Sequence, residues 1–273
     1  MKHPADTKAD EGEKMKAMDL NCDLGESFGP WKMGLDDQVM RYITSANVAC
    51  GWHAGDPMVM NKTVKLAKKL GIAVGAHPGY PDLMGFGRRH IDCTEEELKS
   101  YVTYQVGALD AFCQVHGQKL THVKPHGKLY LDCLDRESQS RAIAEAVCRY
   151  NSKLIYVAFA GRRGQVMRRV AQEVGLKVAF EAFPDRAYTA DGVLVPRSTP
   201  GAVVQDPEEV AERALRIAQE QKMISVDGTL VDLEAQTLCV HGDTPTALEL
   251  VRSIRETLTK NGVEICPLSA ILS

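Results

Sequence analysis

Short apolar segments alternate with amphipathic helical segments along nearly the whole chain, and this alternation restricts the possible folds more than any other feature. Seven segments are expected to form strands: residues 17–25, 46–53, 72–78, 121–127, 154–161, 177–183 and 237–243. Strands separated by helices pair in parallel through right-handed crossovers. Seven such units predict an α/β fold, a seven-stranded parallel (β/α) barrel. An open doubly wound sheet is the alternative.

Helix boundaries are marked by residue types that favour helix ends. Asp or Thr accepts hydrogen bonds from the first free N–H groups, Pro fits the first turn, and Gly fits the position after the last turn. The expected starts are Asp56-Pro57, the capping box Thr94 with Glu97, Asp206-Pro207 and Thr244-Pro245, and the expected ends are Gly71 and Gly262.

Composition narrows the class of protein. The net charge of −3 gives no basic footprint for nucleic acid or for an anionic membrane. Eight cysteines are scattered without a CxxC pair, and no apolar run reaches the length of a membrane span. We therefore expect a cytoplasmic protein with reduced thiols, a disordered tail over residues 1–16, and one barrel domain over residues 17–273.

The histidines indicate where a functional site lies. Of the eight in the chain, five lie in or just after an expected strand: His53, His77, His122, His126 and His241. In parallel barrels the catalytic groups occupy the carboxyl ends of the strands. One histidine at such a place is usually structural, but five converging on one rim predict an active site.

The first expected strand ends with Asn21, Asp23 and Glu26. Because side chains alternate along a strand, Asn21 and Asp23 share the face opposite Leu20 and Cys22. An aspartate at a barrel mouth can act as a general base, bind a metal, or orient a histidine. It can also simply cap the following turn. Glu26 is the natural second carboxylate.

The fourth expected strand carries His122, Lys124 and His126 on one face. Three basic groups are costly to bury in an apolar core, so we expect them to face a polar cavity. A lysine crowded by cations titrates low and can serve as a general acid or as a carboxylate clamp. On this view, replacing Lys124 by Met costs little stability. Arg186 and Arg197 follow the sixth strand, where guanidinium groups could bind a carboxylate or phosphate.

Several long motifs resemble the LamB/YcsF family, collinearly from about residue 17 to the C-terminus. They are DLNCDLGE (19–26), SANVACGWHAGDP (45–57), GAHPGYPDLMGFGRR (75–89), HVKPHGKLY (122–130), DRAY (185–188), VPRSTPGAV (195–203) and CVHGDTP (239–245). The resemblance implies a barrel related to glycoside hydrolase and deacetylase barrels. It also implies one subunit of an ATP-dependent 5-oxoprolinase, which converts 5-oxoproline to L-glutamate together with two partner subunits, B and C.

The implied reaction allows roles to be assigned as hypotheses. The expected catalytic residues are Asp23, Glu26, His53, His77, Lys124, His126 and His241, and the expected substrate-binding residues are Asn21, His122, Arg186 and Arg197. Asp23, assisted by His53 or His126, would activate water. Since no GxxxxGK[ST] motif is present, ATP is expected to be handled with the partner subunits.

Two other functions remain open at this stage. The first is a metal-dependent amidohydrolase or deacetylase that acts alone and binds a divalent ion through Asp23, His53 and His126. The second is a non-catalytic binding module that retains the pocket of an enzyme.

Overall fold

The computed structural model describes residues 17–240 and 246–273. The expected tail over residues 1–16, His241 and the expected helix start at Thr244-Pro245 lie outside the described residues. No helix in the described ranges is both long and apolar enough to cross a membrane. All eight cysteines carry free thiols.

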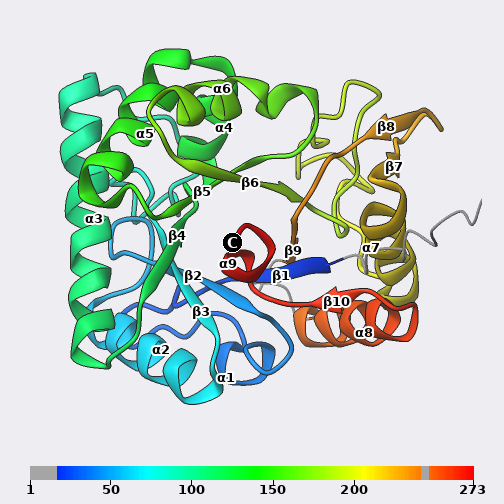
Figure 1. The fold of residues 1–273 in the computed structure, drawn as a ribbon, viewed down its shortest axis with the longest axis horizontal. Helices are drawn as coiled ribbons and strands as arrows, with labels where there is room; N and C mark the ends of the chain where they lie inside the picture. The colour runs from blue at the N-terminus through cyan, green and yellow to red at the C-terminus, as the bar shows by residue number, and fades with distance from the viewer. Residues whose placement is uncertain (1–16, 241–245) are drawn as a thin grey trace, which may run out of the picture.

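Seven parallel strands form a closed barrel (Figure 1). They are β1 (Ala17–Leu24), β2 (Ser45–Ala49), β3 (Ala73–His77), β4 (Leu120–Val123), β5 (Ile155–Phe159), β6 (Lys177–Ala182) and β9 (Thr237–Val240). Each strand pairs with the next in this order, and β9 pairs with both β6 and β1, which closes the ring. The barrel prediction is therefore confirmed, and the open sheet is excluded.

Helices surround this ring on its outer side (Figure 1). In chain order they are α1 (Asp36–Val39), α2 (Pro57–Leu70), α3 (Glu95–Val115), α4 (Gly127–Asp135), α5 (Glu137–Asn151), the 3₁₀ turn η1 (Arg162–Gly164), α6 (Gln165–Glu173), α7 (Pro207–Glu220) and α8 (Ala247–Lys260). The short helix α9 (Leu268–Ile271) lies elsewhere, at one end of the ring. The sequence did not predict the antiparallel hairpin of β7 (Lys222–Ile224) and β8 (Leu230–Asp232), or β10 (Glu264–Ile265), which pairs with the start of β1.

The expected caps are present where the structure describes them. The Asp56 carboxylate accepts hydrogen bonds from the first turn of α2, and Gly71 ends that helix with a φ of 71°. Thr94 and Glu97 form the capping box of α3. Asp206 caps α7, with Pro207 as its first residue. Local sequence therefore defines these helix ends without help from distant contacts.

Strand ends were predicted less accurately than strand positions. The fourth strand was expected to reach residue 127, but β4 ends at Val123 and α4 begins at Gly127. The backbone nevertheless stays extended, because Lys124 N donates to Ala76 O and His126 N donates to Pro78 O. The side-chain alternation of the fourth strand therefore continues past its formal end.

The amino-terminal end of the barrel is closed by apolar side chains. Ile155, Val157 and Ala179 form a buried cluster with Leu268 of α9. Figure 1 shows α9, at the end of the chain, near the centre of the ring. This arrangement leaves the opposite end, where the carboxyl ends of the strands meet, as the open one.

Candidate active site

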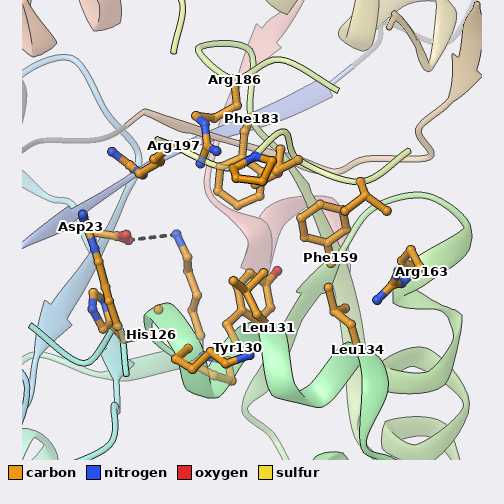
Figure 2. Close-up of a pocket in the computed structure, with 18 of the residues that line it drawn as sticks. Asp23, His126, Tyr130, Leu131, Leu134, Phe159, Arg163, Phe183, Arg186 and Arg197 are labelled. Carbon is orange, nitrogen blue, oxygen red and sulfur yellow. Dashed lines mark hydrogen bonds and ion pairs between the residues drawn. The ribbon is translucent and has the colours of Figure 1, made fainter. Parts of the chain in front are cut away.

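A cavity of about 430 Å³ opens at the carboxyl ends of the strands. Figure 2 shows Asp23 and His126 on one side of it, and Leu134 and Phe159 on the other. Seven of the predicted site residues line it: Asp23, Glu26, His77, Lys124, His126, Arg186 and Arg197. Its walls therefore combine ionisable groups with apolar surface, as is typical of small-molecule sites.

Lys124 lies between two carboxylates on the floor of this cavity. Its Nζ is 2.8 Å from Asp23 Oδ1 and 2.7 Å from Glu181 Oε1. The lysine side chain is only 2% exposed, and Glu181 is fully buried. Lys124 therefore points into the barrel mouth, as the alternation of the fourth strand predicted.

The pKa of Lys124 contradicts the expectation that this lysine titrates low. Burial alone would lower the pKa, but the charges of Asp23 and Glu181 outweigh burial and raise it well above its usual range. The expected crowding by cations is absent at His122, because burial and then Lys124 lower the pKa of that imidazole to about 3. Lys124 is thus a stable ammonium. The expectation that its loss would cost little stability rested on this crowding, whereas removal would strand two buried carboxylates.

Asp23 contacts side chains of other strands, which a residue that only caps a turn would not do. Its Oδ1 accepts a hydrogen bond from Asn47 Nδ2 at 2.8 Å as well as from Lys124, and its Oδ2 lies 3.3 Å from His77 Nε2. The following turn is capped by Asp36, whose carboxylate accepts from Gly25 N. Burial would raise the pKa of Asp23, but His77 and Lys124 hold it well below its usual range. Asp23 is therefore ionised at neutral pH.

Three histidines form a compact cluster beside Asp23. The rings of His53 and His126 stack with centroids 3.6 Å apart, and the ring of His77 meets both edge-on. Burial and the neighbouring rings lower the pKa of His53 well below its usual range and that of His126 to about 3. With Glu26, these residues offer four ligand atoms within 4.8 Å of one another, a group that could hold a metal ion.

The loop after β3 closes tightly over this cluster, and two glycines make that possible. A Cβ at Gly79 would lie 2.7 Å from His53 Nδ1, and one at Gly87 would lie 2.7 Å from His126 Cδ2. Gln105 of α3 is fully buried, and its amide exchanges two hydrogen bonds with the backbone of Gly79. The loop after β3 therefore leaves the side chains of His53 and His126 little room to move.

Asn21 and His122 are not among the residues that line the cavity. Asn21 accepts a hydrogen bond from Asn47 and donates one to Thr237, while His122 Nε2 lies 2.8 Å from Asn47 Oδ1. Asp19 continues this buried polar layer through hydrogen bonds with hydroxyl groups, including that of Thr237. This buried polar layer holds Asp23 in place through the hydrogen bond from Asn47.

The two predicted arginines differ in their contacts. Arg186 donates to Ala202 O and Val195 O, so part of its guanidinium stabilises the loop after β6. Arg197 makes no hydrogen bond or ion pair with the residues that the structure describes. Figure 2 shows both arginines at the same side of the cavity, Arg186 above Phe183 and Arg197 to its left. Arg197 is thus the better placed of the two to bind a ligand.

The sequence interpretation missed three residues that organise the site. Glu181 pairs with Lys124, Asn47 connects three side chains, and Gln105 fixes the loop after β3. Glu181 had a detectable signal, since it is a lone carboxylate within the apolar strand KVAFEAF. The other two are ordinary polar residues in sequence, and only their partners reveal their role. His53 lies behind His126 rather than on the cavity wall, and His241 lies outside the described residues.

A closed parallel barrel with a charged, histidine-rich cavity at the carboxyl ends of its strands has the architecture of barrel enzymes. Comparison with known proteins identifies the family to which the chain belongs. The chain belongs to the LamB/YcsF family, whose model matches residues 18–273.

Similar proteins carry consistent names. The chain is 54% identical over 251 residues to a protein of Pyrococcus furiosus named as the A subunit of 5-oxoprolinase, covering 92% of this chain and 97% of that protein. It is 52% identical to the protein of the same name from Syntrophobacter fumaroxidans, over 92% and 98% of the two chains. A crystal structure of a "Lactam Utilization Protein" from Thermus thermophilus superposes with a TM-score of 0.86 at 47% identity, over 92% and 99%.

Proposed function

We propose that this chain is the A subunit of a cytoplasmic ATP-dependent 5-oxoprolinase, which hydrolyses 5-oxoproline to L-glutamate together with two partner subunits, B and C. The observation that carries this proposal is the buried pair of Asp23 and Lys124, which faces the cavity. The names of relatives that are about half identical over nearly their whole length support it.

The chemistry of a lactam explains why such a site is needed. A five-membered lactam is a stabilised amide, so its carbonyl must be activated before water can attack. Transfer of a phosphoryl group from ATP to the amide oxygen, with loss of the amide proton, supplies this activation. Addition of one water and departure of the protonated ring nitrogen then give an acyl phosphate, which a second water hydrolyses to the carboxylate and phosphate. The cavity of about 430 Å³ exceeds what a bare lactam fills and leaves room for the phosphoryl group.

The described residues can be given roles in this reaction. Asp23 Oδ2 accepts the proton of the attacking water. Because the pKa of Asp23 is low, it is a weak base, and a strongly electrophilic substrate is what such a base requires. Lys124 stabilises negative charge on the reacting oxygen. Arg197 binds the substrate carboxylate.

ATP is assigned to the complex rather than to this chain alone. The sequence lacks the glycine-rich loop that usually cradles nucleotide phosphates. The basic groups Arg88 and Lys128 at the cavity are suited to a phosphorylated intermediate that passes between subunits.

A second candidate function is a metal-dependent amidohydrolase that acts alone. The cluster of Glu26 with three histidines favours it, because such a group could hold a metal that polarises an amide carbonyl. It differs from the first candidate in needing neither ATP nor partners.

Turnover assays separate the two candidates. The full chain is assayed for glutamate release from 5-oxoproline, alone and with both partner subunits, with and without ATP. We expect glutamate only when all three subunits and ATP are present. ATP-independent hydrolysis of an amide by the isolated chain would favour the second candidate, and rapid ATP-dependent lactam opening by the isolated chain would contradict the need for partners.

A further inference from the structure

The hydrogen bonds of His77 determine which of its nitrogens carries a lone pair. Its Nδ1 lies 2.7 Å from the carbonyl oxygen of Lys124. A carbonyl oxygen only accepts, so Nδ1 carries the hydrogen. Its Nε2 faces Asp23 Oδ2 at 3.3 Å. A positive charge, either a proton or a metal ion, therefore has to lie between this nitrogen and its neighbours.

His126 shows the same arrangement. Its Nε2 lies 2.8 Å from the carbonyl oxygen of Phe86, so this nitrogen carries the hydrogen. The lone pair is left on Nδ1, which points at His77 Nε2 at 3.0 Å. In each ring a backbone carbonyl fixes the tautomer, which is the usual way in which metal-binding imidazoles are oriented.

His53 completes the group from behind. The residue is fully buried, and neither ring nitrogen makes a hydrogen bond within the described part of the chain. Its Nε2 is 3.8 Å from Glu26 Oε1, too far for a hydrogen bond. A buried imidazole without hydrogen bonds is costly, and a cation between His53 and Glu26 would remove that cost.

From these contacts we propose that Glu26, His53, His77 and His126 bind one divalent transition-metal ion. Around a tetrahedral ion with bonds of about 2.0–2.1 Å, neighbouring ligand atoms lie about 3.3 Å apart. The nitrogens of His77 and His126, 3.0 Å apart, are already close to this spacing, while His53 and Glu26 are 3.8 Å apart. Because the rings of His53 and His126 are stacked in parallel, binding of the ion would turn His53 out of this stack so that both rings point at it.

Ligand chemistry and local charge define the class of ion. Three imidazole nitrogens with one carboxylate suit Zn²⁺, Co²⁺ or Fe²⁺ better than Ca²⁺ or Mg²⁺, which prefer oxygen ligands. The carboxylates of Asp23 and Glu181 share one ammonium, that of Lys124. Glu26 adds a third carboxylate beside the histidines. These negative groups further favour a bound cation.

The site differs from the set inferred from sequence, which combined Asp23 with His53 and His126. The structure adds Glu26 and His77. Asp23 Oδ1 is occupied by Lys124 and Asn47, while Oδ2 lies beside the proposed ion. Water near such an ion is more acidic than bulk water, so the weakly basic Asp23 could deprotonate it. The metal proposal itself does not depend on the 5-oxoprolinase assignment.

Metal binding to the full chain, purified without an affinity tag, tests the proposal. Metal content is measured by mass spectrometry, and the chelated protein is then titrated with Zn²⁺ by calorimetry and with Co²⁺ by visible absorption. We expect one ion per chain and a Co²⁺ spectrum of nitrogen and oxygen ligation without thiolate bands. Thiolate bands would assign the ion to the cysteines and overturn the proposal.

Four variants locate the ion. Glu26→Gln and His126→Gln should each weaken Zn²⁺ binding at least about 100-fold, since loss of a residue that merely orients a ligand already costs about 10–100-fold. His116→Gln is a control, because this histidine contacts Asn61 away from the cavity. His90→Gln tests the separate contact of His90 with Asp92 and Asp132. Both controls should bind Zn²⁺ as the unmodified chain does.

Circular dichroism and thermal melting of each chelated variant show whether it is folded. If one of Glu26→Gln and His126→Gln does not fold, the other one alone tests the proposal. Absence of stoichiometric metal in the unmodified chain would mean that a proton, not an ion, separates His77 from His126, and would overturn the proposal. Undiminished Zn²⁺ binding by a folded cluster variant, or its loss in His90→Gln, would overturn it as well.

Discussion

The two ends of the barrel interior are filled in different ways. At the amino-terminal end, Ile155, Val157 and Ala179 pack against Leu268. At the carboxyl end, Asp23, Lys124 and Glu181 are buried nearly as deeply, but these three charged groups satisfy one another through ion pairs. Apolar packing is non-directional, whereas a buried charge needs a specific partner.

This difference teaches how the barrel divides its tasks. The apolar end can lose methylene groups one at a time at moderate cost. The polar end is cooperative, because each buried charged group offsets the cost of burying its partner. Substitutions at the two ends should therefore differ in whether they affect turnover, stability or both, and the following predictions run from the largest expected effect to the smallest.

Asp23→Asn should give the largest functional effect. The amide keeps the size of the side chain but cannot take a proton from water, so turnover of the reconstituted complex should fall by about 10²–10⁴-fold. Circular dichroism should show a folded protein. The exposed Asp37, paired with Lys62 at the surface, provides a matched control as Asp37→Asn. Near-normal turnover of Asp23→Asn would mean that Asp23 has no role as a base.

Lys124→Met should affect both stability and turnover. It leaves Asp23 and Glu181 as buried carboxylates without their ammonium, which costs about 3–5 kcal/mol of unfolding free energy in comparable cases. Chemical denaturation measures this loss. The double variant Lys124→Met/Glu181→Gln should recover part of it, because one stranded charge is removed. If Lys124→Met alone is as stable as the unmodified chain, the polar end is not cooperative.

Asp19→Asn should change the pH dependence of stability. Burial raises the pKa of Asp19 from 3.8 to about 6, against the lowering effect of hydrogen bonds from Ser45 and Thr237. A raised folded-state pKa contributes stability that is complete below about pH 4 and is lost as the pH rises through about 6. A pKa difference of about two units between the folded and unfolded states corresponds to about 3 kcal/mol of unfolding free energy. The neutral amide lacks this dependence.

Denaturation at pH 4 and pH 7.5 tests this sign. Relative to the unmodified chain, Asp19→Asn should gain stability on going to pH 7.5, by up to about 3 kcal/mol. The exposed Asp191 serves as control, since Asp191→Asn should leave the pH dependence unchanged. A parallel pH dependence for Asp19→Asn and the unmodified chain would show that Asp19 does not titrate in this range.

Leu268→Ala should lower stability without changing turnover. It opens a space in the apolar cluster at the amino-terminal end of the barrel, for which a Leu→Ala exchange costs about 2–5 kcal/mol. Leu272→Ala, at a partly buried position of the same cluster, should cost less. Turnover per folded complex should stay constant, because the cavity lies at the other end. A large loss of turnover would show that the two ends are coupled.

Much of the fold could be predicted because its signals are local. Each strand that forms the barrel is a short apolar segment, and Asp56, Thr94 and Asp206 cap their helices through atoms a few residues away. The hairpin of β7 and β8 and the short β10 lacked such signals. Their pairing depends on where the larger elements place them, and two- or three-residue strands carry little periodicity.

The sequence by itself determined the parallel barrel, the end at which the polar groups gather, and the inward direction of Lys124. These properties follow from strand alternation and from the shared direction of parallel strands, both of which are visible along the chain. Only the tertiary structure decided which groups touch. It paired Lys124 with Glu181, brought His77 rather than His53 or His126 into direct contact with Asp23, and turned a lysine expected to titrate low into a stable ammonium. Protonation and ligand geometry depend on distances of a few ångströms between residues far apart in sequence, and no pattern along one chain encodes those distances.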